Sequence, residues 1–104
     1  MIVEYIRYKI EPGRSDEFED AYRRAGKLLD ASPHCLRWDA ARSVDDPEKQ
    51  IVRIEWDSAE GHLQGFRRSD DFKPFLEATG SFYDDIEEMT HYEVTTSGGA
   101  TGDG

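Results

Sequence analysis

The chain has 104 residues, of which 37% are apolar and 35% charged, a balance that suits one folded domain with one modest core. Its formal net charge is −10, and residues 55–93 carry eleven acidic but only three basic side chains. Such a field repels phosphate groups, so we expect no nucleic-acid partner and no anionic membrane partner. No apolar run approaches the ~20 residues of a membrane span, and the N-terminus lacks a signal-peptide pattern, so we expect a cytoplasmic protein.

The first half of the chain predicts a strand, a helix and two further strands. Residues 2–10 are rich in β-branched and aromatic side chains, which favours a strand. Residues 16–31 place apolar side chains at helical spacing, and Ser15 is the expected N-cap. Residues 35–43 and 50–56 have strand composition and are separated by a short turn, so we expect them to form a hairpin.

The second half predicts short helical segments followed by a single strand. Ser58 is the expected N-cap of the first short helix, and Ser69 or Asp70 begins a second helical stretch. Residues 82–88 fit either a turn of helix or an irregular connection. Residues 89–95 have the composition of the last strand.

The order β-α-β-β-α-β is the split pattern of ferredoxin-like folds, which belong to the α+β class. We expect residues 1–96 to form a four-stranded antiparallel sheet with helices on one face, and residues 97–104 to form a flexible tail. Three strands each have one largely apolar parity, which we assign to the helix face: Ile2, Ile6, Tyr8 and Ile10, then Val52, Ile54 and Trp56, then Thr90, Tyr92 and Val94.

The opposite parity of these strands mixes apolar, aromatic and charged side chains. Exposing Val3, Tyr5 and Met89 to water would be unfavourable, so we expect a homodimer that packs these sheet faces together. Four polar side chains of this parity would then form a structural network inside the interface or, alternatively, an anion-binding or proton-transfer site: Arg7, Arg53, Glu55 and His91.

Several short segments, taken in order, resemble the antibiotic biosynthesis monooxygenase family. They are Ile10-Glu11-Pro12-Gly13, Pro33-His34-Cys35-Leu36, Ile54-Glu55-Trp56-Asp57-Ser58 with His62-Leu63, and Ser69-Asp70-Asp71-Phe72-Lys73. The resemblance implies a dimeric α/β barrel to which each subunit contributes one sheet. It also implies a substrate cleft between helices and sheet, where quinols or polyphenolic polyketide intermediates are oxidised by dioxygen without metal or flavin.

The chain departs from two branches of this family. It contains no asparagine, whereas polyketide-oxidising members use an Asn with a Trp, and haem-degrading relatives use Asn, Trp and His. Ile6 and Arg7 stand near the expected Asn, and Phe66 and Leu76 stand where haem-degrading relatives carry Trp and His. We therefore expect no haem chemistry, and His62-Leu63 makes the quinol monooxygenase branch the most similar one.

Within this resemblance, His62 is the expected catalytic residue, because an imidazole can deprotonate a phenol near neutral pH. The alternative is a buried histidine that bonds a backbone carbonyl. Five aromatic side chains are expected to be the walls of a substrate pocket or, alternatively, plain core packing: Trp38, Trp56, Phe66, Phe72 and Phe75.

We expect neither a cofactor nor a metal site. Cys35 is the only cysteine, so it forms no internal disulfide and is a poor start for a zinc site. His34, His62 and His91 lack H-x-x-H spacing and fall on three different elements, so we do not expect a metal triad.

Two functions stay open. The first is a cofactor-independent monooxygenase that oxidises a quinol-like or polyphenolic small molecule with dioxygen. The second is a non-catalytic dimeric module that binds a small hydrophobic ligand or assists a partner enzyme.

Overall fold

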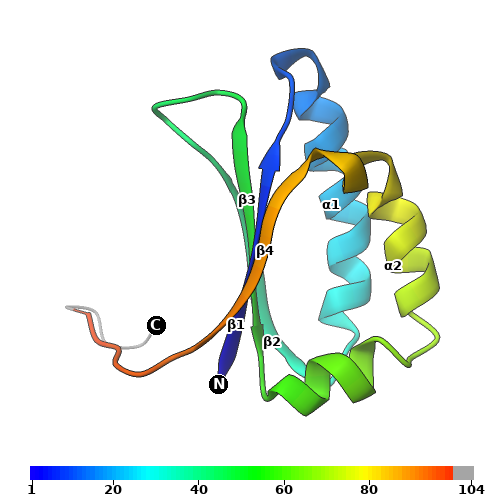
Figure 1. The fold of residues 1–104 in the computed structure, drawn as a ribbon. Coiled ribbons are helices and arrows are strands. Elements are labelled where there is room, and N and C mark those ends of the chain that lie inside the picture. The colour runs from blue at the N-terminus through cyan, green and yellow to red at the C-terminus, as the bar shows by residue number, and fades with distance from the viewer. Residues whose placement is uncertain (100–104) are drawn as a thin grey trace.

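One antiparallel sheet of four strands forms the framework of the protein (Figure 1). The computed structural model describes residues 1–99. The sheet order is β2-β3-β1-β4, and the strands are β1 (Ile2–Lys9), β2 (Cys35–Arg42), β3 (Lys49–Trp56) and β4 (Ile86–Glu93). Each neighbouring pair is antiparallel, which confirms the expected ferredoxin-like α+β fold.

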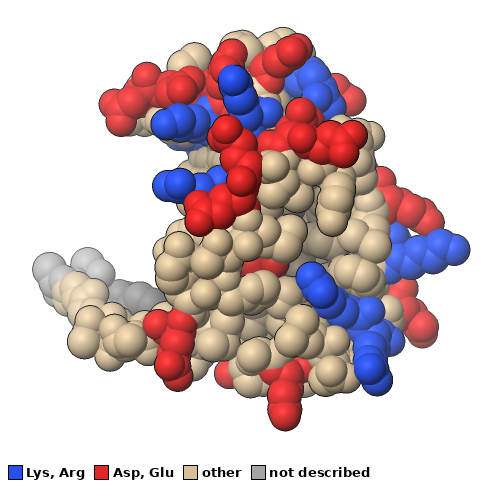
Figure 2. All heavy atoms as spheres, viewed as in Figure 1, with Lys and Arg blue, Asp and Glu red and all other residues tan. Residues whose placement is uncertain are grey.

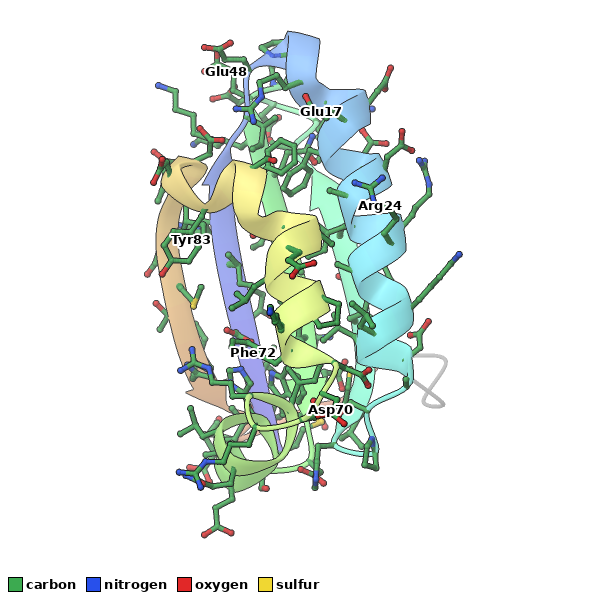
Figure 3. The ribbon with its side chains drawn as sticks, turned by 90° about the vertical axis from the view of Figure 1, so that its right-hand side faces the viewer. Glu17, Arg24, Glu48, Asp70, Phe72 and Tyr83 are labelled. Carbon is green, nitrogen blue, oxygen red and sulfur yellow. The ribbon has the colours of Figure 1, made fainter. Side chains whose placement is uncertain are left out.

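Two α-helices lie side by side on one face of this sheet (Figures 1 and 3). They are α1 (Ser15–Asp30) and α2 (Phe72–Thr79). Three shorter helical segments connect the elements: the 3-10 turn η1 (Pro12–Arg14), the π-helix η2 (Gly61–Phe66) and the 3-10 segment η3 (Gly80–Asp85). Within residues 1–99, no helix covers the opposite face, which we call the open face (Figure 1).

The core forms where the apolar stripe of α1 packs on the two central strands. On the helix side, five side chains are at most 2% exposed: Phe18, Ala21, Tyr22, Ala25 and Leu29. On the sheet side, the buried partners are Ile6, Tyr8, Val52, Ile54 and Trp56. Burying a large apolar side chain stabilises a fold by about 1.5–3 kcal/mol, so this interface fixes the helices on the sheet.

Three helix or strand starts differ from the sequence expectation, and one of them is α2, which begins at Phe72 and not at Ser69 or Asp70. Ser15 is the first residue of α1 and not its N-cap, because η1 runs directly into the helix and leaves Arg14 in the capping position. The last strand begins at Ile86 and not at residue 89, since η3 ends at Asp85 and Ile86 already pairs with Tyr8.

The expected facing of the last strand is wrong. In the β1–β4 register, His91 lies opposite Glu4 and Tyr92 lies opposite Val3. Paired residues of an antiparallel ladder share a face, so His91 points toward the helices and Tyr92 toward the open face. An edge strand beside a cavity does not need apolar side chains on its helix side. The more apolar parity of β4 was therefore a poor guide to which of its side chains face the helices.

The described part of the C-terminal tail contains no regular structure. Residues 97–99 belong to neither helix nor strand, and residues 100–104 lie outside the described residues. The flexibility of residues 97–104 therefore stays a prediction. Among the described residues, none of the helices combines the length and apolar character needed to cross a membrane.

Gly26 sits where α1 meets the indole ring of Trp38, and its substitution tests this packing. A Cβ at position 26 would lie 2.0 Å from a ring carbon of Trp38, whose Nε1–H donates to Asp30 at 2.8 Å. Helix propensity favours Ala over Gly by about 1 kcal/mol, whereas overpacking costs about 1–3 kcal/mol. We expect Gly26→Ala to lower the free energy of unfolding, measured by urea denaturation.

Gly80→Ala is the matched control for this prediction. Its Cβ would meet no atom within 4 Å, and the Gly80 backbone is already in the right-handed helical region. This variant should be as stable as the wild type or slightly more so. A Gly26→Ala protein that shows the same gain would contradict the close contact between α1 and Trp38.

Candidate active site

A cavity of about 590 Å³ lies between the sheet and the segments from η2 to η3. Figure 2 shows a hollow on this side of the molecule that is walled largely by uncharged side chains. Figure 3 labels Phe72 and Tyr83, two of its lining residues, at opposite ends of α2. Most of the wall is apolar or aromatic: Ile6, Ile54, Trp56, Phe66, Phe72, Phe75, Leu76 and Met89.

Glu4 is the acidic side chain in this cavity. It projects from the central strand β1 onto the helix face and is only 3% exposed. Trp56 Nε1–H donates a hydrogen bond to Glu4 Oε1 at 3.1 Å. Burial raises the pKa of Glu4 above its ordinary value, and the Trp56 hydrogen bond and the nearby His91 and Arg67 oppose this shift only in part. Glu4 is therefore a stronger proton acceptor than an exposed carboxylate.

His62 projects into the same cavity from the π-helix η2 and is 4% exposed. Its imidazole stacks on the indole of Trp56, with ring centroids 4.4 Å apart and planes inclined by 13°. Burial lowers the pKa of His62 to about 4, and electrostatic interactions with His91 and Arg67 add to this effect. The imidazole is consequently neutral at neutral pH and is a weaker base than the sequence alone led us to expect.

His91 completes the polar cluster from the edge strand β4. Its Nε2 lies 2.9 Å from His62 Nδ1, within hydrogen-bond distance. The same atom is 3.8 Å from Glu4 Oε2, and His62 Nε2 is 3.6 Å from Glu4 Oε1. One donor atom of each residue lies within 4.8 Å of the others, a grouping of His, Cys, Asp and Glu donors that no other part of residues 1–99 repeats. We call these three residues the Glu4–His62–His91 cluster.

Close backbone packing of η2 holds His62 in this position. A Cβ on Gly61 would lie 2.0 Å from Asp57 Oδ1, and a Cβ on Gly65 would lie 2.2 Å from the His34 ring. His34 and Asp57 are themselves paired at 2.9 Å. The two glycines thus let η2 approach this pair. Ser58 Oγ accepts the Gly61 N–H at 2.9 Å at the start of the helical residues 59–60 that lead into η2, whose own N-cap position is Glu60.

The structure brings together most of the expected pocket residues. Trp56, Phe66, Phe72 and Phe75 line the cavity with His62. Trp38 does not line it, because it lies on the edge strand β2 and its ring packs over Gly26 of α1. Its role as a pocket wall is therefore not supported by its position.

Sequence reasoning missed Glu4, together with the cavity residues Arg67, Tyr83 and Met89. Glu4 carried a usable signal, since it is the only charged residue on the apolar parity of the first strand. A charge in such a position is buried at a cost unless it is paired or functional. Arg67 gave no comparable signal, because it lines the cavity only through the position at which η2 ends.

The expected polar network on the open face forms only in part. Arg53 pairs with Glu55 and donates to the Tyr5 hydroxyl at 3.2 Å, and Arg37 adds a 3.4 Å ion pair to Glu55. Arg7 stands apart and pairs with Glu88 at 3.3 Å. His91 is absent from this network because it points to the helix face.

The Glu4–His62–His91 cluster corrects the expectation that the three histidines lie far apart in the fold. His62 and His91 meet although 29 residues separate them, while His34 stays outside with Asp57. Within one apolar cavity, Glu4 with its raised pKa can accept a proton, and the neutral imidazole of His62 can donate a hydrogen bond. The same three donors are also of the kind that bind transition metals.

Comparison with known proteins agrees with this fold. The sequence profile of the antibiotic biosynthesis monooxygenase family matches residues 1–78. YczJ of Bacillus subtilis, itself uncharacterized, is 25% identical over 93 residues, which cover 89% of this chain and 98% of YczJ.

Two solved structures share the architecture. One, from Bordetella bronchiseptica and classed with the antibiotic biosynthesis monooxygenases, has a TM-score of 0.78, with 23% identity over 91% of this chain and 97% of its own. The other is a variant of SnoaB, a cofactor-independent oxygenase from Streptomyces nogalater, with a TM-score of 0.74, 15% identity and 92% and 94% coverage. Because the family profile matches residues 1–78, the chain belongs to the antibiotic biosynthesis monooxygenase family.

Proposed function

We propose that this protein is a cofactor-independent monooxygenase that oxidises a quinol-like or polyphenolic small molecule with dioxygen. The observation that carries the proposal is the aromatic-walled cavity with Glu4 and His62 on its surface. Membership of the family and the similarity to SnoaB, a cofactor-independent oxygenase, support it. The cavity volume of about 590 Å³ is in the range of small-molecule sites.

The spacing between Glu4 and His62 suits a phenolic hydroxyl. Glu4 Oε1 and His62 Nε2 are 3.6 Å apart, too far for a direct hydrogen bond. A phenolic oxygen placed within about 2.8 Å of both atoms would give its proton to Glu4 and accept the N–H of His62. Glu4 is then the general base, and His62 stabilises the phenolate oxygen. This exchanges the role first expected for His62, because its lowered pKa weakens it as a base.

Loss of the phenolic proton makes the substrate a better electron donor to dioxygen. For a hydroquinone, reaction with dioxygen would give a hydroxyquinone and water. One oxygen atom enters the ring, the other leaves as water, and the substrate supplies all four electrons that dioxygen accepts. Arg67, which lines the cavity, adds positive charge near the developing anion.

Glu4→Gln tests the base. We expect kcat for oxygen uptake with a hydroquinone to fall by ~10²–10⁴-fold at neutral pH, which is the usual contribution of a general base. The rate should recover as the pH rises, since the phenol then ionises without help. The measurement is oxygen consumption by the wild type and the variant across a range of pH.

His62→Ala tests whether His62 stabilises the phenolate oxygen. Loss of one hydrogen-bond donor to the anion should lower kcat by ~10²–10³-fold, and a higher pH should not restore it. Identical pH profiles for Glu4→Gln and His62→Ala would argue against the division of roles. Saturable ligand binding without oxygen uptake by the wild type would instead support the non-catalytic binding module.

We also propose that the open faces of two chains pack together in a homodimer. Tyr92 is half exposed there, and its ring meets Tyr5 edge-on at 5.5 Å beside the Arg53–Glu55 pair. Aromatic surface beside an ion-pair network gives an interface both apolar area and specificity. The helices on the opposite face would remain outside the contact.

Tyr92→Glu tests this interface. A charge introduced among apolar side chains of the open face should shift the protein from a dimer toward a monomer of 11.9 kDa, measured by light scattering at micromolar concentration. Tyr83→Glu is the control, because this exposed tyrosine lies on η3 at the helix side. Equal masses for both variants and the wild type would contradict the open face as the interface.

A further inference from the structure

We propose that Glu4, His62 and His91 together bind one divalent first-row transition-metal ion. The ion would sit at the wall of the cavity, with Zn²⁺ or Co²⁺ preferred over Mg²⁺ or Ca²⁺. This inference goes beyond the proposed oxygenase reaction, because it concerns the substrate-free protein and holds whether or not a quinol is oxidised.

The donor atoms have nearly the spacing of metal ligands. Two ligands bound at about 2.0–2.2 Å lie about 3.0 Å apart when they are at right angles around the ion and about 3.4 Å apart in a tetrahedral site. His62 Nδ1 and His91 Nε2 are 2.9 Å apart, and His91 Nε2 is 3.8 Å from Glu4 Oε2. One donor atom of each of the three residues lies within 4.8 Å of the others, and a carboxylate shift of about 1 Å would bring Glu4 Oε2 to ligand spacing from His91 Nε2.

Apart from the hydrogen bond between His62 Nδ1 and His91 Nε2, the contacts around these donors leave the ligating atoms available. Trp56 Nε1–H holds Glu4 Oε1 at 3.1 Å, so Glu4 Oε2 remains for the ion. His62 would ligate through Nδ1, which leaves its Nε2, 3.6 Å from Glu4 Oε1, to carry the proton on the side of this carboxylate. A ligating histidine commonly directs its other N–H at a carboxylate, and stacking on Trp56 fixes the ring plane. The ion would replace the hydrogen bond between His62 Nδ1 and His91 Nε2, so each imidazole would carry its proton on the nitrogen that does not ligate.

The chemistry of the donor set determines which ion fits. Two imidazoles and one carboxylate are the ligands of catalytic zinc sites and of non-haem iron sites, whereas Mg²⁺ and Ca²⁺ prefer oxygen ligands alone. A dipositive ion also compensates the buried charge of Glu4, whose only hydrogen bond from a side chain within residues 1–99 comes from Trp56. The remaining coordination positions would open into the cavity.

Cobalt titration of the untagged protein, freed of metal by chelation, tests the proposal. Co²⁺ should give visible d–d absorption that saturates at one equivalent per chain, and Zn²⁺ but not Mg²⁺ should abolish it. His91→Ala and Glu4→Gln should each remove the saturable signal. Trp56→Phe, which deletes the hydrogen bond to Glu4 but no ligand, should weaken binding by ~10–100-fold.

His34→Gln is the matched control, because His34 and Asp57 form a histidine–carboxylate pair outside the cavity. This variant should bind Co²⁺ as the wild type does. Absorption that fails to saturate, or that is equal in the wild type and His91→Ala, would overturn the proposal. So would a saturable signal that only His34→Gln removes.

Thermal unfolding provides a second measurement that does not depend on the spectrum. A ligand that binds only the folded state raises Tm by mass action. Zn²⁺ should therefore raise the Tm of the wild type and of His34→Gln but not that of His91→Ala, whose substituted side chain is partly exposed and outside the core. An equal rise in all three proteins, or a rise in none, would overturn the proposed site.

Discussion

The burial of Glu4 is the constraint on which the candidate site depends. This carboxylate leaves the central strand β1 on the face that the helices cover, where removing a charge from water costs several kcal/mol unless partners compensate. Trp56 donates one hydrogen bond, and the two imidazoles of His62 and His91 approach within 4 Å. The cavity beside Glu4 is therefore a place where a proton, a polar ligand or a cation is favoured.

Local backbone structure makes this arrangement geometrically feasible. A π-helix widens the turn that carries His62, and such segments are often found at functional sites. Gly61 and Gly65 let η2 pack directly against His34 and Asp57. The result is that His62 is pressed onto Trp56 and is desolvated, which lowers its pKa and keeps it neutral. The electrostatic character of the site thus follows from how closely one short helix packs.

The two faces of the sheet divide the protein's physical tasks. The helix face holds the apolar core under α1 and the cavity beside α2. The open face carries an ion-pair network around Arg53 and Glu55 together with the exposed ring of Tyr92. Because β-strand side chains alternate between faces, neighbouring residues such as His91 and Tyr92 serve different faces. A single-residue difference in register would exchange these roles.

The sequence by itself determined the fold class and the helix–sheet core. It also identified four aromatic side chains that line the cavity, whereas the fifth one expected there, Trp38, packs elsewhere. Those features follow from local periodicity and from apolar residues that must leave water. Only the tertiary structure decided which residues meet in the Glu4–His62–His91 cluster. Its members come from β1, η2 and β4, and their meeting depends on the β1–β4 register and on the packing of η2. Neither is encoded in spacing along the chain, because both are set by contacts between residues far apart in sequence.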